Sequence, residues 1–164
     1  FTPDASHEDR MPKINLDTLP VVSGSGYPAP FDEPCLKRER ISPGDAAGLT
    51  QFGAHIITLA PGAWSSQRHW HSAEDEFIYI LKGHPTYIDD NGPQPLSPGD
   101  ITAHKAGDPN SHHLKNETSE RVKFLIVGGR APHTDYCRYP DIDLDLPDNG
   151  TPKRVYQRKD GTLY

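Results

Sequence analysis

Short runs of β-branched and aromatic residues, each closed by glycine or proline, recur along the middle of the chain. The run "LTQFGAHIITLA" (49–60) stops at Pro61-Gly62, and "EFIYILKG" (76–83) ends in glycine. A third run, "RVKFLIVGGR" (121–130), closes with a glycine pair. Such runs are typical of strands, and the residues that separate them are typical of turns. Because no useful helical period lies between the runs, the sequence predicts an all-β domain.

A hairpin signal strengthens this prediction. "PTYIDDNGPQPL" contains Asn91-Gly92, a dipeptide that favours the tight turns of two-residue hairpins. "SPGDITAHKAG" then gives a turn, a short strand and another turn. We expect about six to eight short strands between residues 48 and 130, which favours a sandwich or a barrel.

The flanking segments differ from this middle region. Residues 12–44 are rich in proline, glycine and serine, so they predict an irregular arm across the domain or a partner subunit, with disorder as the alternative. The polar segment before Met11 is interpreted as a tag or an upstream extension. Residues 133–164 predict a second arm, in which 141–146 is either an edge strand or a solvated acidic stretch. The expected division is therefore an arm at 1–44, a barrel at 45–132 and an arm at 133–164.

Charge and cysteine content limit the partners and the compartment. The net charge of −6 argues against nucleic acid and anionic membranes as partners. No apolar run approaches the roughly 18 residues of a membrane span, and no signal peptide is visible. Cys35 and Cys137 are too few for a disulfide scaffold, so we expect two free thiols in a reducing, cytoplasmic environment.

The stretch "RHWHSAEDEFIYILKG" places two histidines one residue apart. In a strand, His69 and His71 point to one face about 6.6 Å apart, so both imidazoles can bind one ion. A histidine pair alone is weak evidence, but a carboxylate that leads a buried strand needs a partner, and a metal ion supplies one. Glu74 and Glu76 have the same strand parity, so parity does not choose between them.

A further ligand is expected from "HHLKN" (112–116). His112 shares a strand face with Leu114, whereas His113 shares the other face with Lys115. Because a lysine rarely points into a barrel, we expect His112 inside and His113 outside.

At this point the chain resembles the cupin superfamily, in both of its signature motifs. The first family motif is a glycine, an H-x-H pair, a glutamate and a closing glycine, and its counterpart here is "GAWSSQRHWHSAEDEFIYILKG". The matching residues are Gly62, His69, His71, Glu76 and Gly83. The resemblance thus selects Glu76 over Glu74.

The second family motif is matched by Gly99, Gly107, His112 and Asn116. Two departures affect the loop: Lys105 stands where the family usually has proline, and the gap between Gly107 and His112 is longer than usual. The resemblance covers roughly residues 45–130 and implies a double-stranded β-helix, or jelly-roll barrel. It also implies a homodimer with packed or exchanged arms, and one divalent ion held by His69, His71, Glu76 and His112.

The expected donor set of three imidazoles and one carboxylate suits Fe, Mn, Ni, Co or Zn and leaves open coordination positions. Such an ion supports either a dioxygenase reaction or Lewis-acid chemistry of the isomerase or lyase type on a small oxygen-rich substrate. The alternatives are a barrel that binds a sugar, an acid or a metal without turnover, and a structural protein with incidental histidines.

Candidate catalytic residues beyond the ligands are His104, Tyr79 and Gln51. His104 precedes the altered turn at Lys105, and Tyr79 lies on a predicted strand. Gln51 points inward if the odd-numbered positions of its strand do. For the tyrosine and the histidine, a packing role is the simpler interpretation.

Overall fold

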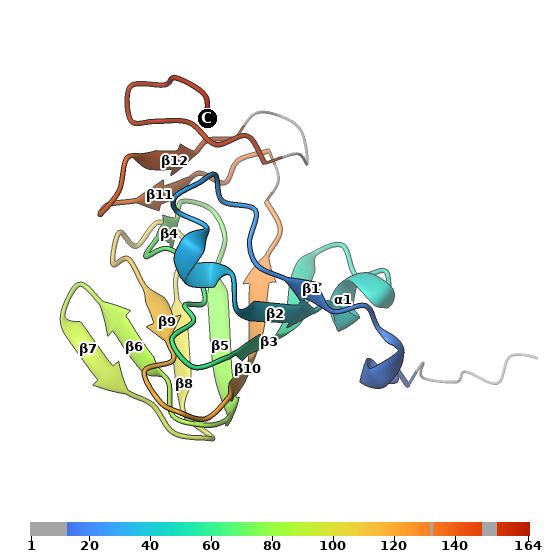
Figure 1. Cartoon of the computed structure of the whole chain (residues 1–164). Coiled ribbons are helices and arrows are strands. Elements are labelled where there is room, and N and C mark those ends of the chain that lie inside the picture. Colours follow the sequence, from blue (N-terminus) through green and yellow to red (C-terminus); the bar gives the residue numbers. More distant parts are fainter. Residues whose placement is uncertain (1–12, 132, 149–153) are drawn as a thin grey trace, which may run out of the picture.

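The computed structural model describes residues 13–131, 133–148 and 154–164, so the segment before Met11 lies outside it. Figure 1 shows strands arranged in three sheets, joined mainly by turns and loops. The large sheet has the order β1 (Val22–Ser23), β2 (Arg38–Ile41), β3 (Phe52–Leu59), β10 (Val122–Gly129), β5 (Glu76–Lys82) and β8 (Ile101–His104). The second sheet is β7 (Gly92–Pro95), β6 (Thr86–Asp89) and β9 (His113–Lys115), and the third is β12 (Leu144–Leu146), β11 (Cys137–Tyr139) and β4 (Trp70–His71).

Helical structure in the described ranges is limited to α1 (Pro43–Ala46) and the 3-10 turns η1 (Leu16–Thr18) and η2 (Glu33–Cys35). This agrees with the all-β prediction. Among the described residues, none of the helices has the length and hydropathy of a transmembrane span.

The core of the barrel lies between the large sheet and the β7-β6-β9 sheet. Strand β5 alternates as a half-buried strand should, with Ile78 and Ile80 buried and Phe77, Tyr79 and Leu81 exposed. The inward residues join one apolar cluster drawn from both sheets: Ile57, Leu59, Ala63, Ile78, Ile80, Tyr87, Leu96, Leu114, Val122 and Phe124. The predicted jelly-roll barrel is therefore confirmed.

Eight strands, β3 to β10, fall between residues 48 and 130, within the expected range. The predicted hairpin is β6–β7, which closes with Asp89 opposite Gly92. The glycine that ends β5 is also required. Gly83 has a φ of +80°, and a Cβ there would lie 2.9 Å from the carbonyl oxygen of Arg121.

Both arms contribute strands, although the N-terminal one was expected to be irregular. Strand β2 pairs with β3 and β1 pairs with β2, so residues 22–41 extend the large sheet. The open edge of β3 offers backbone partners, and this pairing overrides a composition rich in proline and glycine. In the C-terminal arm, residues 144–146 form the edge strand β12, which was one of the two alternatives left open.

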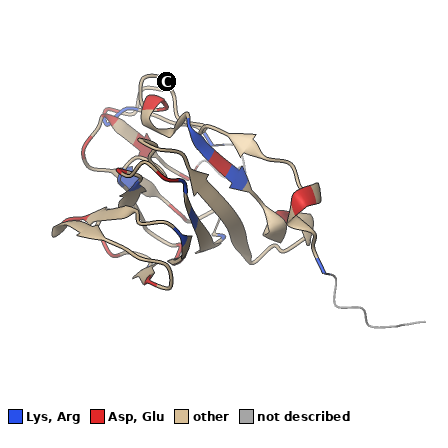
Figure 2. Cartoon of the chain, turned by 60° about the horizontal axis from the view of Figure 1, so that its bottom comes forward, with Lys and Arg blue, Asp and Glu red and all other residues tan. Residues whose placement is uncertain are grey.

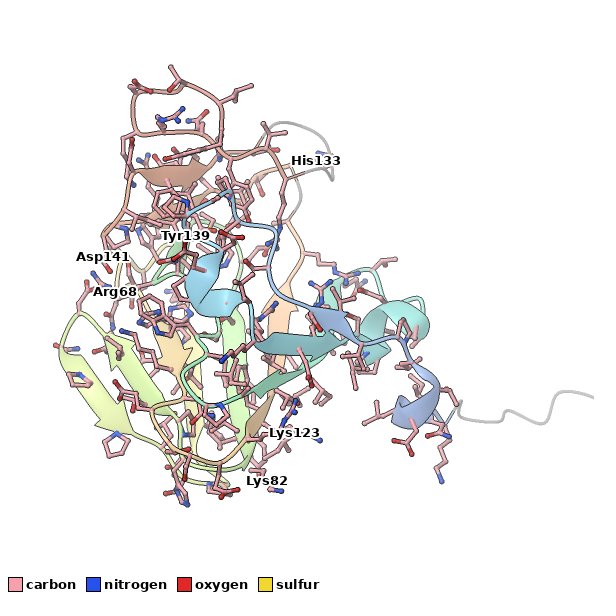
Figure 3. The ribbon with its side chains drawn as sticks, in the orientation of Figure 1. Arg68, Lys82, Lys123, His133, Tyr139 and Asp141 are labelled. Carbon is pink, nitrogen blue, oxygen red and sulfur yellow. The ribbon has the colours of Figure 1, made fainter. Side chains whose placement is uncertain are left out.

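The two arms pack on each other through a second apolar cluster. Its buried members are Cys137, Tyr139, Leu144 and Tyr156, and Tyr27 and Phe31 of the N-terminal arm pack against it. Arg68, just before β4, donates to both carboxylate oxygens of Asp141 at 2.7 Å, a pair labelled in Figure 3. Both cysteines are free and buried.

Candidate metal centre

Two segments that lie far apart in the sequence meet just before β4 and just before β9. The backbone amide of His69 donates to the carbonyl oxygen of His112 at 3.1 Å. The amide of His112 donates to the carbonyl oxygen of His69 at 2.8 Å. Because this bridge fixes the two backbones, the two imidazoles lie side by side, with ring centroids 5.0 Å apart. Glu76, the first residue of β5, lies beside them.

Three of the four expected ligands form one group. Ligand atoms of His69, Glu76 and His112 all lie within 4.8 Å of one another. His112 Nε2 and Glu76 Oε1 are 2.8 Å apart. Two ligands about 2.1 Å from one ion are at most about 4.2 Å apart, so these atoms are already close to coordination distance.

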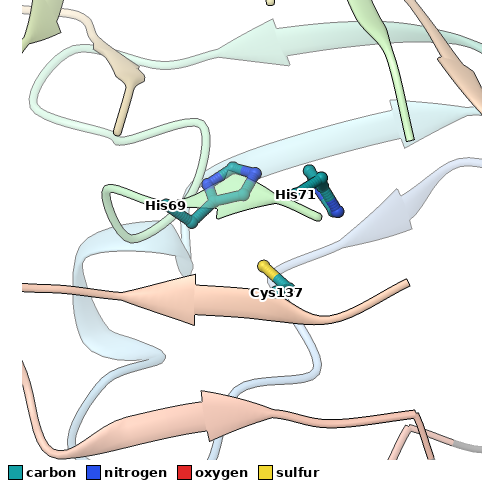
Figure 4. Close-up of side chains that lie close together, drawn as sticks. All are labelled: His69, His71 and Cys137. Atoms are coloured by element: carbon teal, nitrogen blue, oxygen red, sulfur yellow. The ribbon is translucent and has the colours of Figure 1, made fainter. Parts of the chain in front are cut away.

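His71 belongs to an adjacent group that shares His69. Ligand atoms of His69, His71 and Cys137 lie within 4.8 Å of one another, as Figure 4 illustrates. The rings of His69 and His71 are nearly perpendicular, at 85°, with centroids 5.0 Å apart. Cys137 enters because β11 pairs with β4, which places it opposite His71.

Hydrogen bonds orient the two imidazoles of the H-x-H pair. His69 Nδ1 lies 2.8 Å from the carbonyl oxygen of Gln67, which can only accept, so Nδ1 carries the proton. His71 Nδ1 lies 2.6 Å from Asp135 Oδ2. In each ring Nε2 is left for a ligand role, an arrangement typical of histidines that bind metals.

The charge states of His69 and Glu76 also suit metal binding. Burial, together with the nearby imidazoles of His71 and His112, lowers the pKa of His69 to about 3. Burial opposes ionisation of Glu76, but the hydrogen bond from His112 and the surrounding histidines outweigh it and lower its pKa to about 2. A neutral imidazole and an ionised carboxylate are the forms that bind a cation.

The group lies on the wall of a cavity of about 900 Å³. His69, His71, Glu76 and His112 all line it. Both arms contribute to the same wall, with Arg38 and Arg40 from β2 and Asp135 and Tyr139 from the C-terminal arm. A cavity of this size accommodates a small organic molecule.

The three residues predicted as catalytic candidates beyond the metal ligands do not lie on the cavity wall. His104 stacks on His112 with ring centroids 3.3 Å apart, and its buried Nε2 has no partner among the described residues. It is not part of the cavity wall. Tyr79 is 37% exposed on the outer face of β5, and Gln51 is exposed just before β3. The structure therefore brings His104 next to the group and leaves Tyr79 and Gln51 away from it.

His113 differs from its expected place. Its side chain is only 4% exposed, Nδ1 bonds the carbonyl oxygen of Ser66 at 3.0 Å, and its ring packs edge-on against Trp64. The parity argument separated His112 from His113, but the turn that carries Trp64 covers the face expected to be outside.

Sequence reasoning missed Asp135 and Cys137. Both lie in the C-terminal arm, which reaches the histidines through the pairing of β11 with β4 and the bonds beside it. An Asp-x-Cys sequence carries no metal signal of its own, so the pairing would have to be known first.

The family model of the cupin domain matches residues 55–128. A solved protein from Silicibacter pomeroyi, a sugar phosphate isomerase of the cupin superfamily, is 40% identical, with 93% of this chain and 96% of that chain covered at a TM-score of 0.87. The chain belongs to the cupin superfamily.

Two further cupin-fold relatives are more distant. A proposed sugar phosphate isomerase from Acidithiobacillus ferrooxidans is 29% identical, covering 77% of this chain and 74% of that chain at a TM-score of 0.61. A predicted oxalate decarboxylase from Thermotoga maritima is 22% identical, covering 71% and 97% at a TM-score of 0.54, and shares the fold. No curated protein matches the sequence.

Proposed function

We propose that this cupin is a mononuclear metal-dependent isomerase that acts on a small sugar-like carbonyl compound. The observation that carries the proposal is the convergence of His69, Glu76 and His112 on the wall of a cavity of about 900 Å³. The name of the Silicibacter relative, a sugar phosphate isomerase, favours isomerase chemistry over a dioxygenase reaction.

The proposed ligands of the ion are His69, His71, Glu76 and His112. A bound Fe, Mn, Ni, Co or Zn ion would act as a Lewis acid that polarises a carbonyl or hydroxyl oxygen of the substrate. The protein's own part is to hold the imidazoles in place: the carbonyl of Gln67 fixes His69, and the carboxylate of Asp135 fixes His71. An aldose–ketose conversion moves a proton and an electron pair between neighbouring carbons, so it needs no external oxidant.

Metal content and proton exchange test the proposal together. Protein purified without nickel resin and loaded separately with each of the five metals should hold about one ion per chain. With sugars or sugar phosphates in deuterated water under nitrogen, NMR should detect deuterium incorporated next to the carbonyl. Oxygen-dependent turnover, or no exchange with any metal, would overturn the isomerase proposal.

One observation favours a second candidate, a binding barrel without turnover. The thiol of Cys137 lies within 4.8 Å of the ligand atoms of His69 and His71, so it is placed to occupy a coordination position. A site closed by protein ligands is typical of structural rather than catalytic metals. In the cobalt-loaded protein, a thiolate-to-cobalt charge-transfer band that is absent from Cys137→Ser would favour this candidate.

We also propose a homodimer formed through the outer face of the large sheet. Exposed apolar side chains gather there, with Phe77 39%, Leu81 42% and Ile101 53% exposed. Such a face favours contact with another protein surface. Light scattering should give a dimer mass for the wild type and a smaller mass for Phe77→Glu, and a monomeric wild type would refute the dimer.

A further inference from the structure

Strand β2 places two arginines on the inner face of the barrel. Arg38 pairs with Leu59 and Arg40 with Ile57, and directly opposed residues of an antiparallel pair share a face. Leu59 is 0% exposed and Ile57 is 1% exposed, so this face is the interior. The intervening Glu39 points to the other side, where it pairs with Arg121. In Figure 2, β2 is the strand on which an acidic band lies between two basic bands.

Neither inward arginine has an acidic partner within the described ranges. The ion pairs found there use Arg68, Arg121, Arg130, Arg138 and Lys159, together with histidines. The Nε atoms of Arg38 and Arg40 are buried and lack a hydrogen-bond acceptor. Among the described residues, the one bond to either guanidinium runs from Arg38 Nη1 to the carbonyl of Gly24, at 3.1 Å.

A third arginine, Arg154, adds positive charge near this pair. Burial, followed by the positive charges of Arg40 and Arg154, lowers the pKa of Arg38. Arg38, Arg40 and Arg154 line the same cavity. Two of the carboxylates that line the cavity are bonded to other residues, Asp45 to Arg130 and Asp135 to His71. Inward cations that lack a counter-charge are costly unless a ligand supplies one.

We infer that Arg38 and Arg40 form an anion site that binds the phosphate group of a phosphorylated sugar. Guanidinium groups present planar, paired donors that match phosphate oxygens. Because the cavity that holds this arginine pair also holds His69, Glu76 and His112, one ligand can place its phosphate at β2 and its carbonyl at the histidines. This inference rests on the proposed function, which supplies the isomerase chemistry at the carbonyl end of the same ligand.

Calorimetric binding of a matched pair of ligands, a sugar phosphate and the same sugar without phosphate, tests the inference. Arg40→Met should weaken binding of the phosphorylated sugar by about 10- to 100-fold, as expected when hydrogen bonds to a charged group are lost. Binding of the unphosphorylated sugar should stay unchanged. Glu39→Gln, which alters the outward residue of the same strand, is the control and should bind both ligands as the wild type does.

Two further measurements keep the result interpretable. Inorganic phosphate should raise the melting temperature of the wild type more than chloride or acetate of equal ionic strength does, by linkage to the folded state. Arg40→Met should also retain its metal. If metal binding fails in the wild type while phosphate binding persists, the proposed isomerase falls and the anion site stands. Equal affinity of the wild type and Arg40→Met for the phosphorylated sugar, or equal shifts with phosphate and acetate, would overturn the inference.

Discussion

The barrel strands and the two arms face one cavity with different chemistry. The barrel contributes His69, Glu76 and His112, a set of two imidazoles and one carboxylate that suits a cation. The N-terminal arm contributes the cationic side chains of Arg38 and Arg40, suited to an anion. In the proposed enzyme, the barrel would activate the substrate and the N-terminal arm would recognise its phosphate, so the two tasks would belong to different parts of the chain.

The largest effect is expected when one proposed metal ligand of the barrel is removed. His112→Gln should lose nearly all bound metal, because the amide cannot replace the imidazole donor. His113→Gln, a change at the next residue, should keep about one ion per chain, because His113 bonds Ser66 instead. Elemental analysis of both folded variants measures this, and equal metal content would refute the assignment of His112.

Core truncations compare how firmly the two regions are packed. Phe124→Ala, at 0% exposure in the barrel, should cost about 3–5 kcal/mol of unfolding free energy. Tyr139→Ala should cost about 1 kcal/mol less, because the half-buried Tyr27 and Phe31 can move into the space left behind. Urea unfolding followed by tryptophan fluorescence measures both, and a larger loss for Tyr139→Ala would contradict the comparison.

Alkaline pH should destabilise the arms first. Burial raises the pKa of Cys35 from 9.0 to about 11, and burial also raises the pKa values of Cys137 and Tyr27. The folded state keeps protons that the unfolded state releases, so stability is full below pH 9 and falls as pH rises from 9 to 11. Each group contributes about 1.4 kcal/mol per unit of pKa shift.

Unfolding free energies between pH 8 and 11 check this slope. In Cys35→Ala the decline should be shallower, because one titrating thiol is gone. A stability that does not change over this range would contradict the expected effect.

The smallest effect concerns an arm residue that supports the barrel ligands. Asp135→Asn should weaken metal binding by about 10- to 100-fold, because the amide orients His71 less firmly than the carboxylate does. Asp141 in the same arm bonds Arg68 and not His71. The substitution Asp141→Asn should therefore leave metal affinity unchanged. Equal losses in competition titrations would mean that the arm acts only through general stability.

The barrel and the spacing of its histidines were predictable from the sequence because their signals are local. The alternation of β5 and the Asn91-Gly92 turn depend on neighbouring residues, and so does the His69–His71 pair. Strand β2, Asp135 and Cys137 were not predictable. Strand β2 lies in a segment whose proline and glycine content is typical of a loop, and it forms by pairing with β3. Asp135 reaches His71, 64 residues away, because β11 pairs with β4. Tyr79 was a candidate only because it lies on a strand, and that does not specify a sheet face. For Gln51 the odd positions Ile57 and Leu59 are buried as the parity required, but β3 begins at Phe52, so Gln51 lies before the strand and is exposed.

The backbone bridge between His69 and His112 has a consequence for engineering. The hairpin of β6 and β7 lies between these residues in the chain, but the mutual hydrogen bonds hold the ligand-bearing backbones directly. The tip at Asn91-Gly92 is thus a permissive place to graft a peptide or an affinity epitope. In such a fusion, the backbone hydrogen bonds between His69 and His112 would set the spacing of the two imidazoles, and the length of the inserted loop would not.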